Sequence, residues 1–334
     1  MELWIAVSFA LAFAVTNGLH DAANAIATLV ATRGAAPGPA IVLSAVFNLL
    51  GAFLVGTAVA DTIAGIVTLG GEEAVAAIGS GALAAVLWNL LTWSRGLPSS
   101  SGHALVGGLV GAALAAGGVD AVQWGGLDGW KPVGVFGVLI ALAVSPLLGL
   151  AFGFGAIRLS RTALRRATGH IRRPITWSQW GMSAGLSFSH GANDAQKAMG
   201  VVGALLVADG ELATFGVPPW ATLTCAVALT VGTVLGGWRI VWTIGRRIFR
   251  LAPLDAFSSQ AASTAVILGS SFAGAPVSTT HVVASSLVGI GGGRRRWRHV
   301  RWVVVRDMAS AWALTLPVTA VLGGVTFLVW TEIL

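Results

Sequence analysis

The sequence predicts an all-α polytopic membrane protein of two inverted-topology repeats, each with about five apolar segments and a re-entrant hairpin near the bilayer midplane. Three observations support this class. Of 334 residues, 55% are hydrophobic and 10% charged, whereas average soluble domains carry about 25% charged residues. Apolar stretches long enough to cross a bilayer recur along the chain. Two polar motifs each occur twice, in the same order. A soluble enzyme is therefore not expected.

The apolar segments support the membrane class one by one. The first begins near Leu3 without a preceding basic stretch or a small-residue cleavage site, so we expect a retained span rather than a signal peptide. Segments longer than about 20 residues are expected to be tilted, broken or double. To within about 2–4 residues, the segments are 3–30, 38–60, 75–93, 98–118, 133–157, 174–207, 219–244, 253–272, 276–293 and 302–330.

Basic residues lie between these segments and predict the orientation. Fifteen of the 20 Lys and Arg residues are in four places: Arg33; Arg158, Arg161, Arg165, Arg166, Arg172 and Arg173; Arg246, Arg247 and Arg250; Arg294, Arg295, Arg296, Arg298 and Arg301. The alternate loops are acidic or nearly neutral. The positive-inside rule places the basic loops in the cytoplasm and the N-terminus outside, in the plasma membrane. Because no aromatic-interleaved basic motif occurs outside these loops, we expect lipid contact and no nucleic-acid binding.

Internal repeats divide the chain. VTNGLHDAAN at 15–24 resembles FSHGANDAQK at 188–197, and GLPSSSGH at 96–103 resembles GAPVSTTH at 274–281. Two further pairs, Gly51 with Gly232 and Pro146 with Pro317, follow in the same order and are separated along the chain by nearly the same interval. We therefore predict a first repeat over 1–157, a basic cytoplasmic linker over 158–173 and a second repeat over 174–334.

The segment count gives the relation between the repeats. An odd number of spans inverts the second repeat, which is the usual construction of secondary transporters with sites at the midplane. In each repeat the Pro-and-hydroxyl motif joins two apolar segments with few residues between them. Re-entrant hairpins would place both tips within the membrane, where irregular backbone must be buried or line a wet cavity. The first hairpin would open outward and the second inward.

The hairpin tips suit an oxyanion. Pro98 and Pro276 fit the first turn of a helix, and the free N–H groups of a helix start favour an anion. A tetrahedral anion could be enclosed by both tips through Ser99, Ser100, Ser101, Ser278, Thr279 and Thr280. The alternative is that these hydroxyl groups bond backbone carbonyls while the prolines only kink the helices.

The repeated acids predict an ion site. Asp21 and Asn24 are three residues apart and share a helix face, and Asn193 precedes Asp194. Carboxylates at membrane depth are costly and mark function by default; oxygen ligands suit sodium or a proton relay. Helix capping by the acids is a compatible alternative. Four histidines inside the motifs are expected to line the site: His20, His103, His190 and His281. With one cysteine, Cys225, and no close His pair, we expect neither a disulfide nor a bound metal or cofactor.

These motifs resemble those of the inorganic phosphate transporter family, and the likeness covers nearly the whole chain. The family signature is a duplicated G-A-N-D-x-x-N motif, which residues 191–194 match letter for letter and residues 17–24 match through Asp21 and Asn24. The resemblance implies an inverted-repeat secondary transporter that imports orthophosphate with a cation, often as a homodimer. It also implies that Asp21, Asn24, Asn193 and Asp194 serve the ion and substrate site, while the tip hydroxyl groups bind phosphate.

Two departures from the signature bear on coupling. His20 stands where the motif has Asn, and Lys197 stands where the second copy would have the counterpart of Asn24. Lys197 can pair with Asp194 three residues earlier and take the place of a bound cation. The sequence therefore favours proton coupling, with the substrate as phosphate or metal-phosphate. Alternatively, Lys197 reaches an aqueous cavity and only adds positive potential.

Other functions remain as alternatives: a sodium-coupled phosphate symporter, or a carrier of another oxyanion such as sulfate. An anion channel is disfavoured, because two acids in the pathway would oppose anions unless a cation compensates them. The sequence shows no nucleophile with an oriented base, so an enzyme is not expected.

Overall fold

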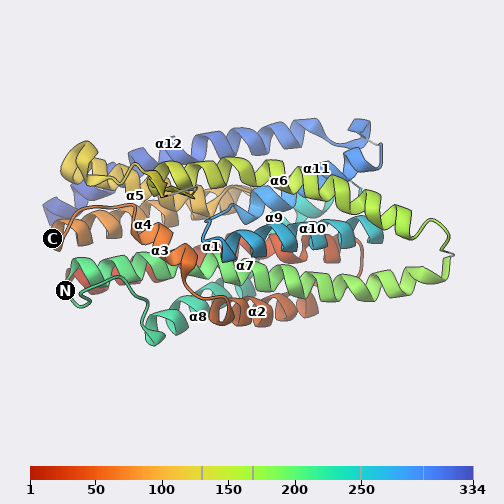
Figure 1. The fold of residues 1–334 in the computed structure, drawn as a ribbon, viewed down its shortest axis with the longest axis horizontal. Helices are drawn as coiled ribbons and strands as arrows, with labels where there is room; N and C mark the ends of the chain where they lie inside the picture. Colours follow the sequence, from red (N-terminus) through yellow and green to blue (C-terminus); the bar gives the residue numbers. More distant parts are fainter. Residues whose placement is uncertain (129–130, 168, 249, 296, 334) are drawn as a thin grey trace.

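The computed structural model describes residues 1–128, 131–167, 169–248, 250–295 and 297–333 as a bundle of long helices (Figure 1). The α-helices are α1 (Glu2–Ala31), α2 (Pro37–Leu54), α3 (Ala58–Ala64), α4 (Gly71–Arg95), α5 (Ser101–Gly117), α6 (Gly134–Ala163), α7 (Arg172–Ala208), α8 (Pro219–Leu235), α9 (Trp238–Trp242), α10 (Pro253–Phe272), α11 (Thr279–Gly293) and α12 (Trp302–Ile333).

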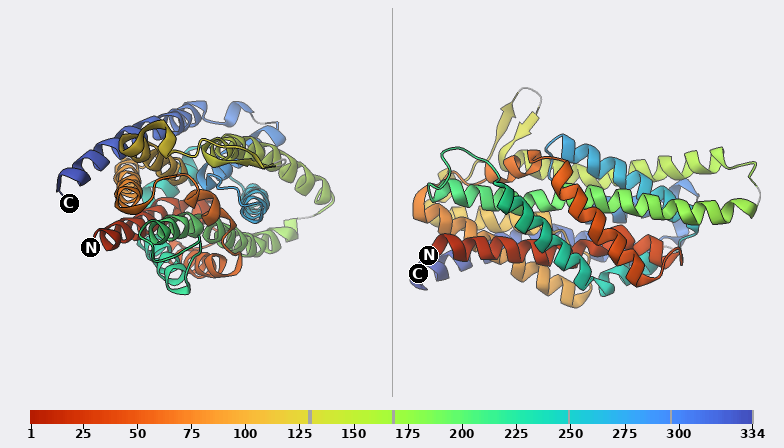
Figure 2. Two further views of the ribbon diagram at one scale, coloured as in Figure 1. Left: turned by 60° about the vertical axis from the view of Figure 1, so that its left-hand side comes forward. Right: turned by 90° about the horizontal axis from the view of Figure 1, so that it is seen from below.

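Short elements connect these helices. The 3-10 turns are η1 (Gly118–Ala121), η2 (Gly169–Ile171) and η4 (Trp297–His299), and η3 (Thr243–Arg247) is a π-helical turn. The strands β1 (Gly126–Asp128) and β2 (Lys131–Val133) form an antiparallel hairpin that pairs Gly126 with Val133. Both chain termini lie with this hairpin at one end of the bundle, here called the terminal end, and η2 lies at the opposite, linker end (Figures 1 and 2).

Six helices in the described residues are long and apolar enough to cross a membrane, and α8 with residues 238–245 forms a seventh candidate bent by 63°. The polytopic class is therefore confirmed. The six are α1, α2, α4, α5, α6 and α12. Helix α7, which carries the second acidic motif, runs parallel to the same bundle axis (Figure 1).

The two halves interlock as inverted copies. Helices α1 and α7 run in opposite directions, since α1 begins and α7 ends at the terminal end (Figure 1). Helix α1 packs against α8 and α4, as α7 packs against α2 and α10. The α4–α5 hairpin packs against α12, the last helix of the other half, and the α10–α11 hairpin packs against α6. The predicted inverted-repeat fold is confirmed.

Glycines make the central crossings close. A Cβ at Gly18 or Gly191 would lie 2.0 Å from a carbonyl oxygen of the facing helix, and one at Gly51 or Gly232 would lie 1.9 Å from one. A side chain cannot fit at such distances, so glycine lets each pair of backbones touch. These crossings are next to the acidic motifs in sequence and fix how deeply α1 and α7 enter the bundle.

The hairpins turn at matching positions. Gly96 follows the last residue of helix α4 and has φ of +64°. The other tip contains Gly274, which has φ of +68°. This left-handed conformation favours glycine and stops a helix. The α4–α5 hairpin opens toward the terminal end and the α10–α11 hairpin toward the linker end (Figures 1 and 2).

The structure differs from the predicted segments at three places. The segment expected over 38–60 breaks after Leu54, because Gly56 has φ of +86° and α3 starts anew. The segment expected over 219–244 bends at Gly236, which has φ of +74°. Residues expected to form a basic linker are partly helical, since α6 continues to Ala163. The β1–β2 hairpin was not predicted from sequence.

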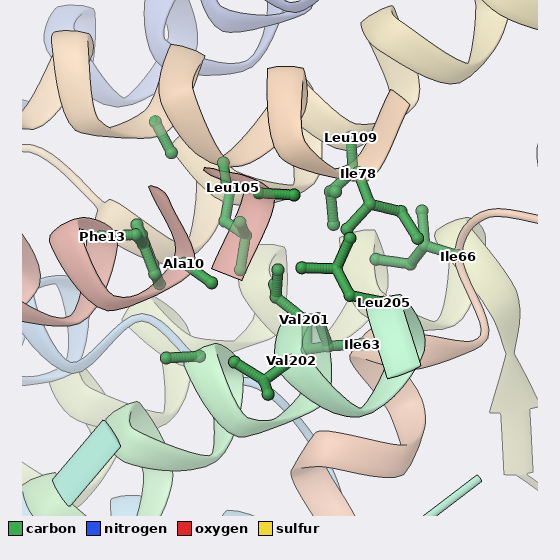
Figure 3. Close-up of a cluster of buried hydrophobic side chains, with 14 of the residues drawn as sticks. Ala10, Phe13, Ile63, Ile66, Ile78, Leu105, Leu109, Val201, Val202 and Leu205 are labelled. Carbon is green, nitrogen blue, oxygen red and sulfur yellow. The ribbon is translucent and has the colours of Figure 1, made fainter. Parts of the chain in front are cut away.

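Two apolar clusters enclose the acidic motif of α1. Phe13 and Ala14 belong to the first cluster, with Leu105 of α5, whereas Ala23 and Ile26 belong to the second. Figure 3 shows the first cluster, in which side chains of α1, α3, α4, α5 and α7 interdigitate. The polar stretch between Ala14 and Ala23 is therefore held between two apolar layers.

Candidate functional site

Asp21 of α1 is buried and accepts bonds from both hairpin tips. Ser101 at the start of α5 donates to Asp21 Oδ2 at 2.8 Å, and Thr280 in the first turn of α11 donates to Oδ1 at 2.7 Å. His20 Nδ1 lies 3.0 Å from Oδ1. Residues from three helices of both halves thus converge on this carboxylate.

Asp194 of α7 is surrounded in a similar way but also contacts a cation. Thr279 of α11 donates to Asp194 Oδ2 at 3.1 Å, and His190 Nε2 lies 2.8 Å from the same oxygen. Lys197 Nζ donates to Oδ1. The lysine side chain is 1% exposed, so its charge interacts with the carboxylate without solvent screening.

Asn24 and Lys197 occupy equivalent positions and behave differently. Asn24 Nδ2 donates to Thr280 Oγ1 at 2.9 Å, while its buried Oδ1 has no hydrogen-bond partner among the described residues. Lys197 Nζ reaches the second tip and donates to Val277 O at 3.0 Å. At this position, one motif thus has an amide with an unpaired oxygen and the other has a charged donor.

Both tips begin helices that serine caps. Ser100 Oγ accepts from His103 N at 3.2 Å and Ser278 Oγ accepts from His281 N at 3.3 Å. Earlier N–H groups of a first turn have no partner within the helix and can bind an anion. The rings of His103 and His281 lie 4.9 Å apart between centroids, so the two helix starts face a common volume.

Asp21, His190 and Asp194 offer a place for a shared cation or proton. One ligand atom of each lies within 4.8 Å of the others, and all three residues are buried. Carboxylate and imidazole groups at this distance can hold a metal ion or pass a proton between them. The two aspartates have further hydrogen-bond partners in the chain, which orient them.

The phosphate transporter family model matches this chain twice, over residues 17–173 and 161–323. The chain belongs to that family. The two matches follow the duplication seen in the sequence, and membership places the chain among transporters rather than enzymes, as expected.

Relatives are similar over nearly the full chain. A probable low-affinity inorganic phosphate transporter of Mycobacterium tuberculosis (strain ATCC 25618 / H37Rv) is 41% identical, over 97% of this chain and 76% of the relative. A protein of the same description from Bacillus subtilis (strain 168) is 37% identical, over 96% and 94%. A solved structure titled "The sodium-dependent phosphate transporter" shares the fold, with a TM-score of 0.87, 24% identity and full coverage of both chains.

Some predicted site residues in this family member support the tips rather than face the shared volume. Ser99 Oγ accepts from Trp88 Nε1 at 2.8 Å and lies 3.0 Å from Thr315 Oγ1. Asn193 Nδ2 donates to Ser271 Oγ and Ala275 O, which holds the second tip. These contacts show positions, and a direct role in substrate binding stays a prediction for both.

Sequence reasoning missed Asn17 and Gln196. Asn17 Oδ1 lies 2.7 Å from Ser101 Oγ, and Gln196 Oε1 accepts from Val59 N at 2.7 Å. Asn17 is the counterpart of His190 when the two acidic motifs are aligned on their aspartates, and that equivalence is the signal that could have identified it. For Gln196 the sequence carries no comparable signal, because its partner is a backbone group of the other half.

A cavity of about 780 Å³ reaches the second tip. It is lined by Asp61 and Gln123, near the β1–β2 hairpin at the terminal end, and by Ala141 of α6 and Val277 of the tip. Val277 is the residue whose carbonyl accepts from Lys197. The cavity is therefore lined by a residue that also bonds the buried ammonium group.

The equivalent position at the first tip holds a tryptophan. Trp312 of α12 is the counterpart of Ala141 when the repeats are aligned on Pro146 and Pro317. Its indole donates to Pro98 O at 3.1 Å and stacks on His281 with centroids 3.9 Å apart. The first tip thus has an indole against it, while the second tip has the cavity beside it.

Proposed function

We propose that this protein is a secondary active transporter that imports inorganic phosphate by cation symport, with protons as the coupling ion. One observation carries the proposal: two capped helix starts from inverted hairpins face each other around Asp21, Asp194 and Lys197. Family membership and the names of the relatives support phosphate as the substrate class.

Phosphate fits the donors at the two tips. First-turn N–H groups favour an anion, and the Lys197 ammonium adds positive charge between the tips. In this structure, the carboxylates of Asp21 and Asp194 accept hydrogen bonds from Ser101, Thr279 and Thr280. When phosphate binds, a protonated phosphate oxygen could donate to these carboxylates in place of the hydroxyl groups. Sulfate carries no proton at neutral pH and would leave a buried carboxylate unpaired, so we expect its rejection.

The contacts of the carboxylates support proton coupling. Each oxygen of Asp21 and Asp194 already contacts a donor or an imidazole of the chain. A sodium ion would have to displace some of these donors, whereas a proton needs no coordination shell. His20 and His190 contact the acids directly and are the expected carriers.

Sodium coupling is the second candidate, favoured by Asn24. Its buried Oδ1 has no partner among the described residues, and an amide oxygen beside a carboxylate suits a hard cation. The cluster of Asp21, His190 and Asp194 would also accommodate the metal of a metal-phosphate substrate. Both alternatives are separable by experiment.

The predicted orientation gives the cavity a direction. If the N-terminus is outside the plasma membrane, the cavity over the second tip opens to the exterior, which is the state that receives substrate for import. Labelling of an Asp61→Cys/Cys225→Ser variant with a membrane-impermeant maleimide in whole cells tests this. Labelling only after permeabilisation would show that this cavity opens to the cytoplasm and that the N-terminus lies inside.

Radiolabelled phosphate uptake into proteoliposomes tests the function. We expect a pH gradient to drive uptake at constant sodium, a protonophore to abolish it, and replacement of sodium by choline to leave it unchanged. Uptake that needs sodium and survives the protonophore would establish the second candidate. Adding a chelator tests the metal-phosphate form. Arsenate should compete and sulfate should not; conductive phosphate flux without saturation would indicate a channel instead.

A further inference from the structure

Two equivalent half-sites share one backbone frame and differ in two residues. The first half-site consists of Asp21, Asn24 and Thr280. The second consists of their repeat counterparts Asp194, Lys197 and Gly102, as alignment of the two motif pairs shows. In each, the third member comes from the hairpin of the opposite half, so the comparison tests chemistry in nearly equal geometry.

The first half-site has an unfilled acceptor position. Asn24 Nδ2 donates to Thr280 Oγ1 at 2.9 Å, and Thr280 Oγ1 donates to Asp21 Oδ1 at 2.7 Å. Asn24 is 1% exposed and its Oδ1 has no partner among the described residues. An unpaired buried oxygen is costly, and this one is available to a donor or cation that binds beside Asp21.

The second half-site is filled by the chain itself. Lys197 Nζ donates to Asp194 Oδ1 and to Val277 O. A Cβ built at Gly102 would lie 3.4 Å from Lys197 Nζ and 3.6 Å from Cε. Because a Cβ alone would already contact the lysine end, the two γ atoms of a threonine would compete with it for space. The glycine therefore makes room for the ammonium, and the lysine takes the place of the Asn–Thr pair.

The charges differ accordingly. Lys197 compensates the Asp194 carboxylate through a direct bond, whereas the described partners of Asp21 are neutral hydroxyl groups and the imidazole of His20. His190 contacts Asp194 through Nε2, and His103 and His281 contact each other, with ring centroids 4.9 Å apart. A buried carboxylate without a permanent cation must gain one during the cycle or bear a large desolvation cost.

We propose that Lys197 and Gly102 limit this protein to one coupling cation per phosphate, which is exchanged at the Asp21 half-site. A molecule with an Asn–Thr pair in both half-sites would exchange two. The inference rests on the proposed symport but not on the identity of the ion, because a proton or sodium would be compensating the same carboxylate. Lys197 is then the specificity-determining residue for stoichiometry, and Gly102 is its steric partner.

The double variant Gly102→Thr/Lys197→Asn tests the proposal by rebuilding the missing pair. Proteoliposomes are clamped at zero membrane potential, and the phosphate accumulation ratio is measured against the imposed cation gradient, in separate pH and sodium arms. On logarithmic axes the slope equals the number of cations per phosphate. We expect one for the wild type and two for the double variant.

The single variants and a control separate pairing from damage. Lys197→Asn leaves Asp194 without its cation, and Gly102→Thr crowds the lysine, so each should lower initial uptake at least tenfold, with the double variant faster than either. Gly155→Thr is the matched control, because this helical glycine is exposed and a Cβ there meets no atom within 4 Å. Its uptake should equal that of the wild type.

Each outcome bears on a different claim. A wild-type slope of two would overturn the inference while leaving symport intact, and absence of gradient-driven phosphate uptake in the wild type would instead overturn the proposed function. A double variant that keeps a slope of one would also reject the inference. Unfolding temperatures in detergent test the pairing even in variants with little uptake. The double variant should lose less stability than the two single variants together, and additive losses of stability would refute the pairing.

Discussion

The two acidic half-sites show how an inverted repeat can keep a geometry and change its charge. Ser101 donates to Asp21 and Thr279 donates to Asp194, so equivalent hydroxyl groups make equivalent bonds. Three residues farther along each helix, Asn24 is neutral with a free acceptor and Lys197 is a cation bonded to its acid. Duplication therefore supplies the frame, and individual side chains set the charge of each half.

The largest expected difference is between Asp194→Asn and Asp21→Asn. Both should abolish coupled uptake, but Asp194→Asn also leaves Lys197 as an uncompensated buried charge, which costs about 3–5 kcal/mol. Unfolding in detergent measures the difference. The compensating variant Asp194→Asn/Lys197→Met should regain most of the lost stability. Equal losses for the two single variants would show that Lys197 does not depend on Asp194.

Trp312 and Ala141 give the second comparison. Trp312→Ala removes a ring that stacks on His281 and bonds Pro98, so we expect a loss of about 3–5 kcal/mol and water access from the linker end. Ala141→Trp should fill the terminal-end cavity and block uptake with little loss of stability. Thermal unfolding and uptake, measured together, distinguish these results; similar behaviour of both variants would contradict the difference between the ends.

A smaller effect is expected at Thr280. Thr280→Val removes the hydroxyl group that joins Asn24 to Asp21, leaving buried polar groups unpaired at a cost of about 1–3 kcal/mol. Thr280→Ser keeps the hydroxyl group and should behave as the wild type. Phosphate affinity and unfolding are the measurements. A wild-type affinity in Thr280→Val would separate the first half-site from substrate binding.

The smallest effect concerns the helix caps. Ser100→Ala and Ser278→Ala each remove a side-chain acceptor for a backbone N–H, and loss of such a cap costs about 0.5–2 kcal/mol. Phosphate binding should weaken by about 0.5–3 kcal/mol if the serines also bond the substrate. Calorimetric titration gives the affinity. The two variants should match, since both caps occupy equivalent positions; a large inequality would show that only one tip holds phosphate.

The sequence predicted the inverted fold, and it singled out Asp21 and Asp194 as candidate site residues, because the repeated motifs and their order are visible in one chain. It did not predict that Thr280 bonds Asp21, since that contact joins residues far apart in the chain and in opposite halves. Nor did it show that Ser99 would bond Trp88 of its own hairpin, because the direction of each hydroxyl group depends on where helix α5 begins. The break after Leu54 depends on the backbone of Gly56, which segment hydropathy does not report.

The difference between Trp312 and its repeat counterpart Ala141 has a consequence for the whole transport cycle. In a carrier with identical halves, the state open to one side would be the mirror image of the state open to the other, and the two would have equal energy apart from their surroundings. Here one position holds an indole that bonds Pro98 and the other holds a methyl group beside a cavity. For the proposed symport, this difference would bias the empty carrier toward one side before any gradient acts, and its forward and reverse transport rates would then differ.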